Sequence, residues 1–379
     1  MTDRSHWEVF QQTSNSRVVR EGRFIVVELA NPHRVLSTSA LTGGQNDALR
    51  YLVNHQSCEG RAHLDRHEVV TSQGQDHYHR ATSAELGLLP EETALMGTAA
   101  NMNYAALARE AYADVSVTAI VTAGVEGNAT CAGDPADWHE GEDGWARANP
   151  HDGTINTIVL LDCPLTPAAQ ARAVLTMTEA KSAALHDLAV SSRYSQDLAT
   201  GTGTDQFCLA VPIDAARKSR EGAGPHCKLG ELIGRAVRSA TKEALRWQNG
   251  LEVSYTRGIF RALGRYGVTE ELLTARLKEL LSAADYELFE NNSKSAYFEP
   301  QVSAAAYALA AVLDRARAGT ISKDIAASAI RQQSAVLASS LAAKPSEWRQ
   351  FWDALQPDPD DPAEAVAQAM AQGWQAKWS

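Results

Sequence analysis

The sequence predicts a mixed α/β (α+β) fold: a layered structure with a mixed central sheet flanked by helices, followed by an all-helical C-terminal domain. Two observations support this class. Strand-like runs of β-branched and aliphatic residues, such as Gly153–Leu161, alternate with helical patterns, such as Ala168–Leu188, in the first part of the chain. Further along, strand-like runs disappear and alanine and leucine dominate. We therefore expect an α/β domain at residues 1–247 and a helical domain at residues 248–379.

The elements of the first domain follow from local patterns and turn residues. Strands are expected at Arg23–Leu29, Val35–Ala40, Thr93–Thr98, Tyr104–Tyr112, Val115–Val125, Gly153–Leu161 and Phe207–Val211. Helices are expected at Asn46–Asn54, Ser83–Leu88, Ala168–Leu188 and along the apolar face from Leu229 to Ala244. Two residues separate the fourth strand from the fifth, so we predict a hairpin there and not a purely parallel sheet. Ser57–Thr82 has no clear period and is expected to be a loop.

The second domain is expected to consist of helices separated by glycine and proline breaks. These helices are Glu252–Arg265, Glu270–Ala284, Val302–Ala318, Lys323–Ala342, Ser346–Leu355 and Ala363–Ala376. Ser322 is placed to cap the fourth helix, and Pro362 occupies a first-turn position. Two roles for this domain stay open, namely covering an active site or forming a homo-oligomer interface.

Composition excludes several classes of protein. The formal net charge is −11, which disfavours binding to the phosphate backbone of nucleic acids. No apolar run approaches the ~20 residues of a membrane span, and the N-terminus lacks the order of a signal peptide. The five cysteines are odd in number and form no Cys-x-x-Cys pair, which indicates a reducing compartment. We expect a cytoplasmic protein that binds a small molecule, without nucleic-acid or membrane partners.

The helix predicted at Ala168–Leu188 carries two charged residues of interest. Its apolar stripe is expected to comprise Val174, Leu175, Thr178, Ser182, Leu185 and Ala189. Lys181 falls near this stripe and Glu179 on its other side, and residues two positions apart cannot pair within a helix. A lysine near a buried face needs a carboxylate partner or a functional role. The alternative is a lysine that extends to solvent beside an ordinary surface glutamate.

The glycine-rich segment Gly222–Gly234 enters the second motif helix. His226 and Lys228 lie at its start, where free backbone N–H groups could hold an oxyanion or a phosphate. A histidine there could transfer a proton near neutral pH, and Glu231 follows in the first turn. The alternative is an ordinary capped helix with a solvated acid.

Two glycine-containing loops are also candidate joints, by which we mean connections between elements where polar residues cluster. Thr200–Asp205 precedes a strand and lacks a third glycine, so it does not match a dinucleotide fingerprint. Asp205 could be a base, a metal ligand or the residue that forms an Asx turn. Thr122–Asn128 ends a strand with two glycines, which suit either close approach of a ligand or a plain turn.

A group of histidines raises the question of a metal. These residues are His55, His63, His67, His77 and His79. Their spacing matches no known zinc signature, so a protein-bound divalent metal is compatible with the sequence but supported by no motif. The chain also lacks a Gly-x-Ser-x-Gly elbow, which argues against a standard serine hydrolase.

Taken together and in order, several motifs resemble the adenosylcobinamide amidohydrolase family. They are Leu36–Gly44, Asn54–Gln56, Thr122–Val125 with Asn128, Gly153–Asn156, Thr178–Leu185, Ala199–Asp205, and His226 with Lys228–Gly234. The resemblance covers roughly residues 20–247. It implies an enzyme of corrinoid salvage in cobalamin biosynthesis, which hydrolyses the amide between a corrin-ring propionate and aminopropanol to give adenosylcobyric acid. The cobalt would belong to the substrate, and no protein cofactor is implied with certainty.

On this resemblance we expect the joints after Thr178, around Thr204 and at Pro225 to form one polar hollow. Glu179 or Asp205 would be the base, and Lys181, with Lys228 and the backbone N–H groups near His226, would hold the oxyanion. The remaining expected site residues are His226 as proton donor and Glu231 as the acid that orients Lys228 or His226. The expected substrate-binding residues are Asn54, His55, Thr122, Gly124, Asn128, Asn156, Thr202, Gly203 and Lys228.

Two alternatives to this function stay open. The long Gly127–Asp152 loop and the helical domain suit a hydrolase of the same family that acts on a different small-molecule amide or lactam. The second alternative is a non-catalytic corrinoid-binding protein.

Overall fold

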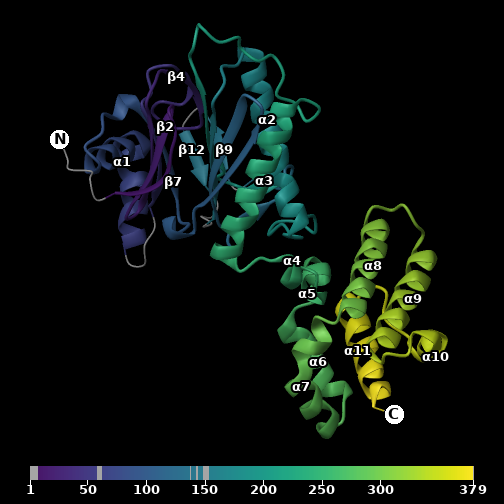
Figure 1. Ribbon diagram of the computed structural model, residues 1–379. Coiled ribbons are helices and arrows are strands. Elements are labelled where there is room, and N and C mark those ends of the chain that lie inside the picture. Colours follow the sequence, from purple (N-terminus) through teal and green to yellow (C-terminus); the bar gives the residue numbers. More distant parts are fainter. Residues whose placement is uncertain (1–6, 58–61, 137, 142–143, 148–152, 379) are drawn as a thin grey trace. The chain divides into compact units, whose positions relative to one another are not determined.

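The computed structural model describes residues 7–57, 62–136, 138–141, 144–147 and 153–378. The chain divides into two compact units (Figure 1). The first comprises Met1–Leu188 and Leu198–Leu251, and the second comprises Ala189–Asp197 and Glu252–Ser379. The first unit mixes helices with mixed sheets and the second is helical, so the predicted fold class is confirmed.

A five-stranded sheet forms one half of the first unit. Its order is β1 (Glu8–Gln12), β2 (Ser16–Glu21), β3 (Phe24–Leu29), β6 (Tyr51–Gln56) and β7 (Thr93–Thr98). The strands are antiparallel except for β6 and β7, which are parallel and are connected through α1 (Ala62–Glu85). Phe24, Val26 and Val53 of this sheet pack with Leu86 and Leu88, which follow α1.

A six-stranded sheet forms the other half. Its order is β5 (Gly44–Asn46), β4 (His33–Ser37), β15 (Gln206–Pro212), β13 (Ile155–Leu161), β9 (Val115–Ala123) and β8 (Ala106–Tyr112). The predicted hairpin is confirmed by the antiparallel pair β8–β9. β13 and β15 are parallel and are joined through α2 (Pro167–Asp187), while α3 (Lys228–Asn249) packs on β9 and β8.

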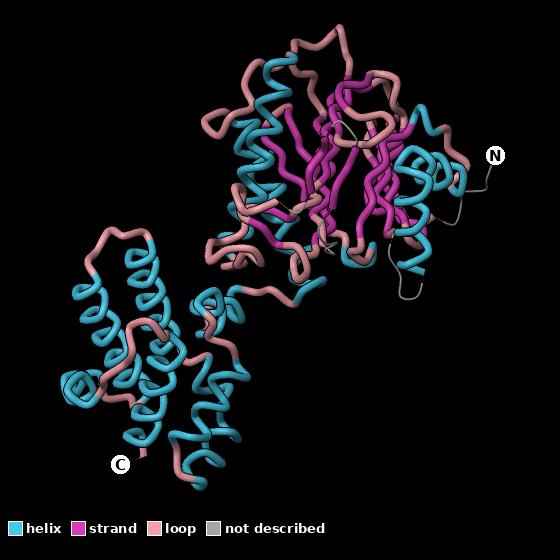
Figure 2. Tube along the Cα trace, turned by 180° about the vertical axis from the view of Figure 1, so that it is seen from behind, coloured by secondary structure: helices cyan, strands magenta, loops and turns pink. Residues whose placement is uncertain are grey.

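The two sheets pack face to face around a shared apolar core. This core combines Ile25, Val27 and Leu52 of the five-stranded sheet with Ile120 and Ile158 of the six-stranded sheet. Figures 1 and 2 show the resulting layers, with α1 outside one sheet and α2 and α3 outside the other. Because side chains alternate along a strand, each sheet has one face toward this core and one toward its helices.

Shorter elements connect these layers. They are the 3₁₀ turns η1 (Pro90–Glu92) and η2 (Met102–Tyr104), the antiparallel pair β10 (Ala129–Thr130) and β14 (Gly201–Thr202), and the hairpin β11 (Trp138–Gly141) with β12 (Gly144–Arg147). The β10–β14 pair ties the segment after β9 to the loop before β15, two segments that are far apart in sequence.

The second unit is an array of helices with its own core. Its elements are α4 (Val253–Thr256), α5 (Ile259–Leu263), η3 (Gly264–Tyr266), α6 (Glu270–Leu280), α7 (Ala283–Tyr297), α8 (Pro300–Arg317), α9 (Lys323–Leu341), η4 (Pro345–Glu347), α10 (Trp348–Ala354) and α11 (Pro362–Lys377). Phe289 meets Tyr297 and Trp374 edge-on, with ring centroids 5.6 and 5.2 Å apart. Ser322 accepts a hydrogen bond from the Ile325 amide, and Pro362 opens α11, as predicted.

Two sequence-based expectations about elements are wrong, one expected helix is divided, and one helix was not predicted. Asn46–Asn54 is not a helix, because Leu52 and Val53 lie in the strand β6 between β3 and β7. Ser57–Thr82 is not a loop, because it contains most of α1. The helix was not predicted because its sequence is polar and only weakly amphipathic. The helix expected at Glu252–Arg265 is divided into α4 and α5, and residues 283–297 form the helix α7, which was not predicted.

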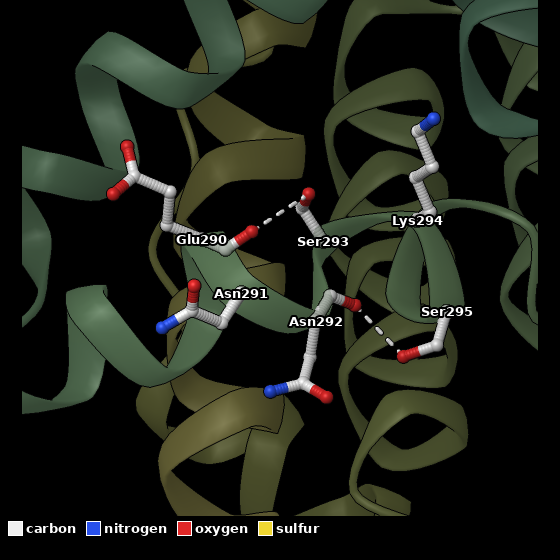
Figure 3. A pocket seen from close by; sticks show the side chains of 6 residues that line it. All are labelled: Glu290, Asn291, Asn292, Ser293, Lys294 and Ser295. Carbon is white, nitrogen blue, oxygen red and sulfur yellow. Dashed lines mark hydrogen bonds between the residues drawn. The ribbon is translucent and has the colours of Figure 1, made fainter.

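Among the described helices, none is both long enough and apolar enough to cross a membrane. A hollow of about 330 Å³ lies along α7 (Figure 3). It is lined by the six consecutive residues Glu290–Ser295 of that helix, and Ser293 and Ser295 donate their hydroxyl hydrogen bonds to backbone carbonyls of the same helix. This hollow is the outer surface of one helix and brings no distant residues together.

Candidate functional site

Polar side chains from distant segments gather at one end of the first unit, which we call the polar end. Here β9 finishes at Ala123, while β13 and β15 begin at Ile155 and Gln206. The register places Thr122 opposite Asn156, and Asn156 opposite Gln206. The carboxyl ends of β6 and β7 lie at the same end, because the backbone amide of Gly97 donates to Gln206 Oε1 at 3.2 Å.

A buried carboxamide network joins the two sheets at the polar end. Asn54 Nδ2 donates to Thr122 Oγ1 at 2.7 Å, and Asn156 Nδ2 donates to Asn54 Oδ1 at 2.8 Å and to the Gly97 carbonyl at 3.0 Å. All three side chains belong to residues that are at most 2% exposed. A buried polar network is stable when its groups are paired, so these contacts fix the relative position of the sheets here.

An ion pair between Lys181 of α2 and Asp205 lies beside this network. Their side chains are 15% and 18% exposed. Asp205 Oδ1 accepts the Ile155 amide at 3.0 Å and the Thr202 hydroxyl at 2.5 Å, while Oδ2 accepts the Thr202 amide at 3.1 Å and the Lys181 ammonium group. Each carboxylate oxygen therefore holds two donors. This arrangement makes Asp205 an anchor for Lys181 and for the loop that contains Thr202, and it leaves Asp205 poorly suited to take a proton from water.

The loop before β15 requires glycine next to this ion pair. A Cβ atom on Gly201 would lie 2.4 Å from Asp205 Oδ2 and 2.7 Å from Lys181 Nζ. Both distances are far below van der Waals contact, so a side chain at this position would displace the ion pair. The first glycine of the Thr-Gly-Thr-Gly-Thr sequence is thus explained by close packing against Lys181 and Asp205, whereas a Cβ atom on the second, Gly203, would lie 3.0 Å from Asn128 Oδ1.

Asn128 connects a third segment to the same loop. Its Nδ2 donates to the Gly153 carbonyl at 3.0 Å, and its backbone carbonyl accepts the Gly203 amide at 3.3 Å. Thr204 Oγ1 donates to the same Gly153 carbonyl at 2.9 Å. The expected grouping of Asn54, Thr122, Asn128, Asn156, Thr202 and Gly203 at one place is therefore seen. Gly124 lies there too, since its amide donates to the Thr154 carbonyl at 3.0 Å.

Glu179 faces away from this cluster. It is exposed on α2, and residues two apart on a helix point about 200° apart, so it cannot approach Asp205 alongside Lys181. The predicted stripe through Leu175 and Thr178 is wrong. The buried face of α2 comprises Ala169, Gln170, Ala173, Thr176, Met177, Ala180, Ala184 and Leu185. Alanines form much of this buried face, so the prediction, which relied on larger aliphatic residues such as Leu175, placed the face wrongly.

The start of α3 lies at the opposite end of the sheet. Lys228 Nζ lies 4.7 Å from the ring centroid of Tyr112, a residue that precedes the start of β9. At the other end of α3, Asn249 Oδ1 accepts the Val125 amide at 3.2 Å, just after β9 ends. The nine residues of β9 span roughly 27 Å at about 3.3 Å per residue. The Ala223 carbonyl before Pro225 does contact α2, since it accepts the Thr176 hydroxyl at 2.8 Å, but Lys228 extends toward Tyr112 and away from Asp205. The expected hollow shared by all three joints is therefore wrong.

His226, Lys228 and Glu231 consequently do not join Lys181 and Asp205. His226 is exposed, and Lys228 Nζ donates to Glu231 Oε2 at 2.5 Å across one helical turn. This hydrogen bond holds the pKa of the Glu231 carboxyl below its usual value. These residues form a solvated first-turn ion pair, which is the alternative that the sequence left open.

His55 also lies apart from the carboxamide network. It follows Asn54 in β6, so its side chain points to the α1 side of the sheet. There it stacks on Phe24 with centroids 4.4 Å apart, and its Nδ1 lies 2.6 Å from the Tyr78 hydroxyl. Its expected role in shaping the pocket is not compatible with this orientation.

The other histidines give no metal site in the described part of the chain. Burial lowers the pKa of His79, which lies 3.2 Å from the Pro90 carbonyl. The side chains of His63 and His67 lie outside the described residues. Among the residues that the structure describes, no group of three or more His, Cys, Asp or Glu side chains could hold a metal ion.

Three further carboxamides at the polar end escaped the sequence analysis. They are Gln206, the first residue of β15, and Gln248 and Asn249, the last two residues of α3 before the left-handed Gly250. Gln248 Oε1 accepts the Asn101 amide at 3.0 Å. The helix-ending glycine was a usable signal, but the sheet register that brings both glutamines to this end was not visible in the sequence.

Comparison with known proteins identifies the class. A family model described as "Adenosylcobinamide amidohydrolase" matches residues 8–253, which is more than half of the chain. The chain therefore belongs to the adenosylcobinamide amidohydrolase family. A relative from Methanocaldococcus jannaschii, "Uncharacterized protein MJ1613", is 32% identical over 245 residues, which cover 62% of this chain and 91% of that protein. The resemblance inferred from the motifs is confirmed at the level of the family.

Proposed function

We propose that this protein hydrolyses a linear amide of a corrinoid, with adenosylcobinamide as the substrate and adenosylcobyric acid and aminopropanol as products. The observation that carries the proposal is the family match, which covers nearly all of the first unit. The polar end supports it, because the family motifs Asn54–Gln56, Thr122–Val125, Gly153–Asn156 and Ala199–Asp205 converge there. In this reaction water adds to the amide carbon, the C–N bond breaks, and the amine leaves with a proton.

Lys181 is the residue that we assign to charge stabilisation. Amide hydrolysis develops negative charge on the carbonyl oxygen, and a fixed cation next to that oxygen lowers the barrier. Asp205 holds the ammonium group in place through a hydrogen bond, and only one of the three ammonium N–H groups is needed for that contact. Asp205 then acts as a positioning residue, and its two oxygens remain bound to the loop amides throughout.

The decisive experiment is incubation of the full chain with adenosylcobinamide, followed by mass analysis for aminopropanol and adenosylcobyric acid. We expect both products in equal amounts. Parallel reactions with a chelator test whether a protein-bound divalent metal takes part. A heat-denatured sample controls for spontaneous hydrolysis.

Two outcomes would redirect the proposal. Release of an amine from a smaller amide or lactam, without reaction of the corrinoid, would favour a different substrate within the family. Tight corrinoid binding without product would favour a binding protein. The absence of both binding and turnover of the corrinoid would overturn the proposal.

A further inference from the structure

The carboxamides at the rim of the polar end are oriented by the backbone. Gln206 Oε1 accepts the Gly97 amide at 3.2 Å, Gln248 Oε1 accepts the Asn101 amide at 3.0 Å, and Asn249 Oδ1 accepts the Val125 amide at 3.2 Å. A backbone N–H can only donate, so in each case the oxygen branch must face it. The –NH₂ branch of each side chain is thereby directed away from the backbone that holds it.

These –NH₂ groups are available as donors. All three side chains are half-buried, and no acceptor for their nitrogen atoms is found among the described residues. A carboxamide that is ordered by one hydrogen bond loses little further entropy when its other branch binds a ligand, which favours recognition. The fold therefore orders these three side chains before a ligand binds.

The three groups lie around the same loops as the proposed reaction site. Gly97, which holds Gln206, also accepts Asn156 Nδ2 through its carbonyl. Gln248 Cγ lies 3.8 Å from the position of a Cβ atom on Gly124, whose amide is bonded to the Thr154 carbonyl. The rim thus borders the buried carboxamide network directly.

We propose that Gln206, Gln248 and Asn249 are specificity-determining residues that bind the carbonyl oxygens of a substrate edged with neutral carboxamide arms. The inference rests on the proposed function, because a corrin ring carries acetamide and propionamide arms around its edge. An –NH₂ donor pairs with an amide carbonyl, and the second lone pair of the glutamine oxygen accepts the N–H of the same arm. The donors are uncharged, and the charge of Lys181 is balanced by Asp205, so the rim suits neutral arms better than carboxylates or phosphates.

The test uses substitutions that keep the anchor and remove the donor. Gln248→Glu, Gln206→Glu and Asn249→Asp retain an oxygen for the backbone amide but replace –NH₂ with a second oxygen. Binding of cobinamide is measured by absorbance titration, and KM and kcat are measured where turnover occurs. We expect each variant to weaken binding about tenfold and to raise KM with kcat within about twofold, as loss of one net hydrogen bond requires.

Two further variants separate the donor from charge and from folding. Gln248→Met is neutral and lacks both the donor and the anchor, so it should weaken binding to a similar degree and also lower the melting temperature. Gln45→Glu adds the same charge on the exposed strand β5 and should leave binding unchanged.

The outcomes distinguish this inference from the proposed function. Wild-type affinity of Gln248→Glu and Gln206→Glu would overturn the inference even if adenosylcobinamide is hydrolysed. Weakened cobinamide binding by the variants, without hydrolysis by the wild type, would retain the inference and overturn the proposed reaction. Absence of cobinamide binding by the wild type would overturn both.

Discussion

The two ends of the six-stranded sheet each carry a lysine paired with an acid near a glycine-rich segment, yet their surroundings differ. At the polar end, Lys181 and Asp205 are 15% and 18% exposed, and two backbone amides and a hydroxyl also converge on the carboxylate. At the opposite end, Lys228 and Glu231 are 43% and 30% exposed and lie on one turn of α3.

This difference separates an ion pair that the backbone holds in place from a solvated surface ion pair. A half-buried cation whose position is fixed by hydrogen bonds can act on a developing charge without reorganisation. An exposed pair one turn apart is screened by water and contributes little to stability. Residue type and nearby glycines were similar at the two ends, so the surrounding backbone donors decide which pair can carry chemistry.

The largest expected effect is on turnover when Lys181 is neutralised. Lys181→Met should lower kcat by about 10²–10³-fold, because the stabilising charge is lost while most of the side-chain length is kept. Lys228→Met, which removes the same charge at the opposite end, should lower kcat far less. Steady-state kinetics with adenosylcobinamide measure both, and Lys218→Met, on an exposed loop, is the control for surface charge. Equal losses at Lys181 and Lys228 would contradict the comparison.

The next effect concerns stability. Asn156→Ala should lower the free energy of unfolding by about 2–3 kcal/mol, because Asn54 Oδ1 and the Gly97 carbonyl lose their buried donor. At the opposite end, Ser116→Ala removes a half-buried hydroxyl that donates to Asp162 and should cost about 1 kcal/mol. Urea denaturation measures both. A smaller loss for Asn156→Ala than for Ser116→Ala would show that the carboxamide network does not hold the sheets together.

A third pair of variants tests the close packing of the loop before β15. Gly201→Ala must displace the ion pair and should reduce kcat about tenfold, since small displacements of positioned groups are costly to catalysis. Gly234→Ala meets nothing within 4 Å in α3 and should raise the melting temperature through better helix propensity, with kcat retained. Wild-type kcat in Gly201→Ala would argue that the position of the Lys181–Asp205 pair is unimportant.

The smallest expected effect is on how the free energy of unfolding changes at acidic pH. The Arg238 hydrogen bond lowers the pKa of Asp187, which links the end of α2 to the middle of α3. Because the folded pKa lies below the unfolded value of about 3.9, this pair stabilises above that pH and its contribution is lost as the pH falls through the folded pKa. Asp187→Asn should therefore cost less than about 1 kcal/mol at pH 7 and a smaller amount at about pH 3, below the unfolded pKa. Urea denaturation at the two pH values checks this, and an equal loss at both would exclude the electrostatic explanation.

Much of the fold was predictable from short-range patterns. The hairpin β8–β9, the strands β7, β13 and β15, and the apolar face of α3 were all expected, because their periodicity and turn residues lie within single segments. The helix α1 and the strand β6 were missed. Polar α1 shows little periodicity, and the four-residue span of buried side chains in β6 resembles a short helical segment.

The candidate site was predictable in part. Family motifs identified Lys181, Asp205 and the carboxamides Asn54, Asn128 and Asn156, although the pattern gave no distances among them. It also grouped His226 with them, because a glycine-rich helix start is a common site for chemistry and the direction of α3 along the sheet was unknown. Contacts at both ends of α3 corrected that assignment.

The sequence by itself determined the family, the mixed fold class and the separate helical region, because hydrophobic periodicity, capping residues and ordered motifs are local properties. The tertiary structure alone decided which polar residues meet. Strand order, register and the direction of each crossover fix those meetings, and they depend on pairing between segments that are far apart in the chain. Lys181 therefore meets Asp205, whereas Lys228 meets Tyr112 one sheet length away.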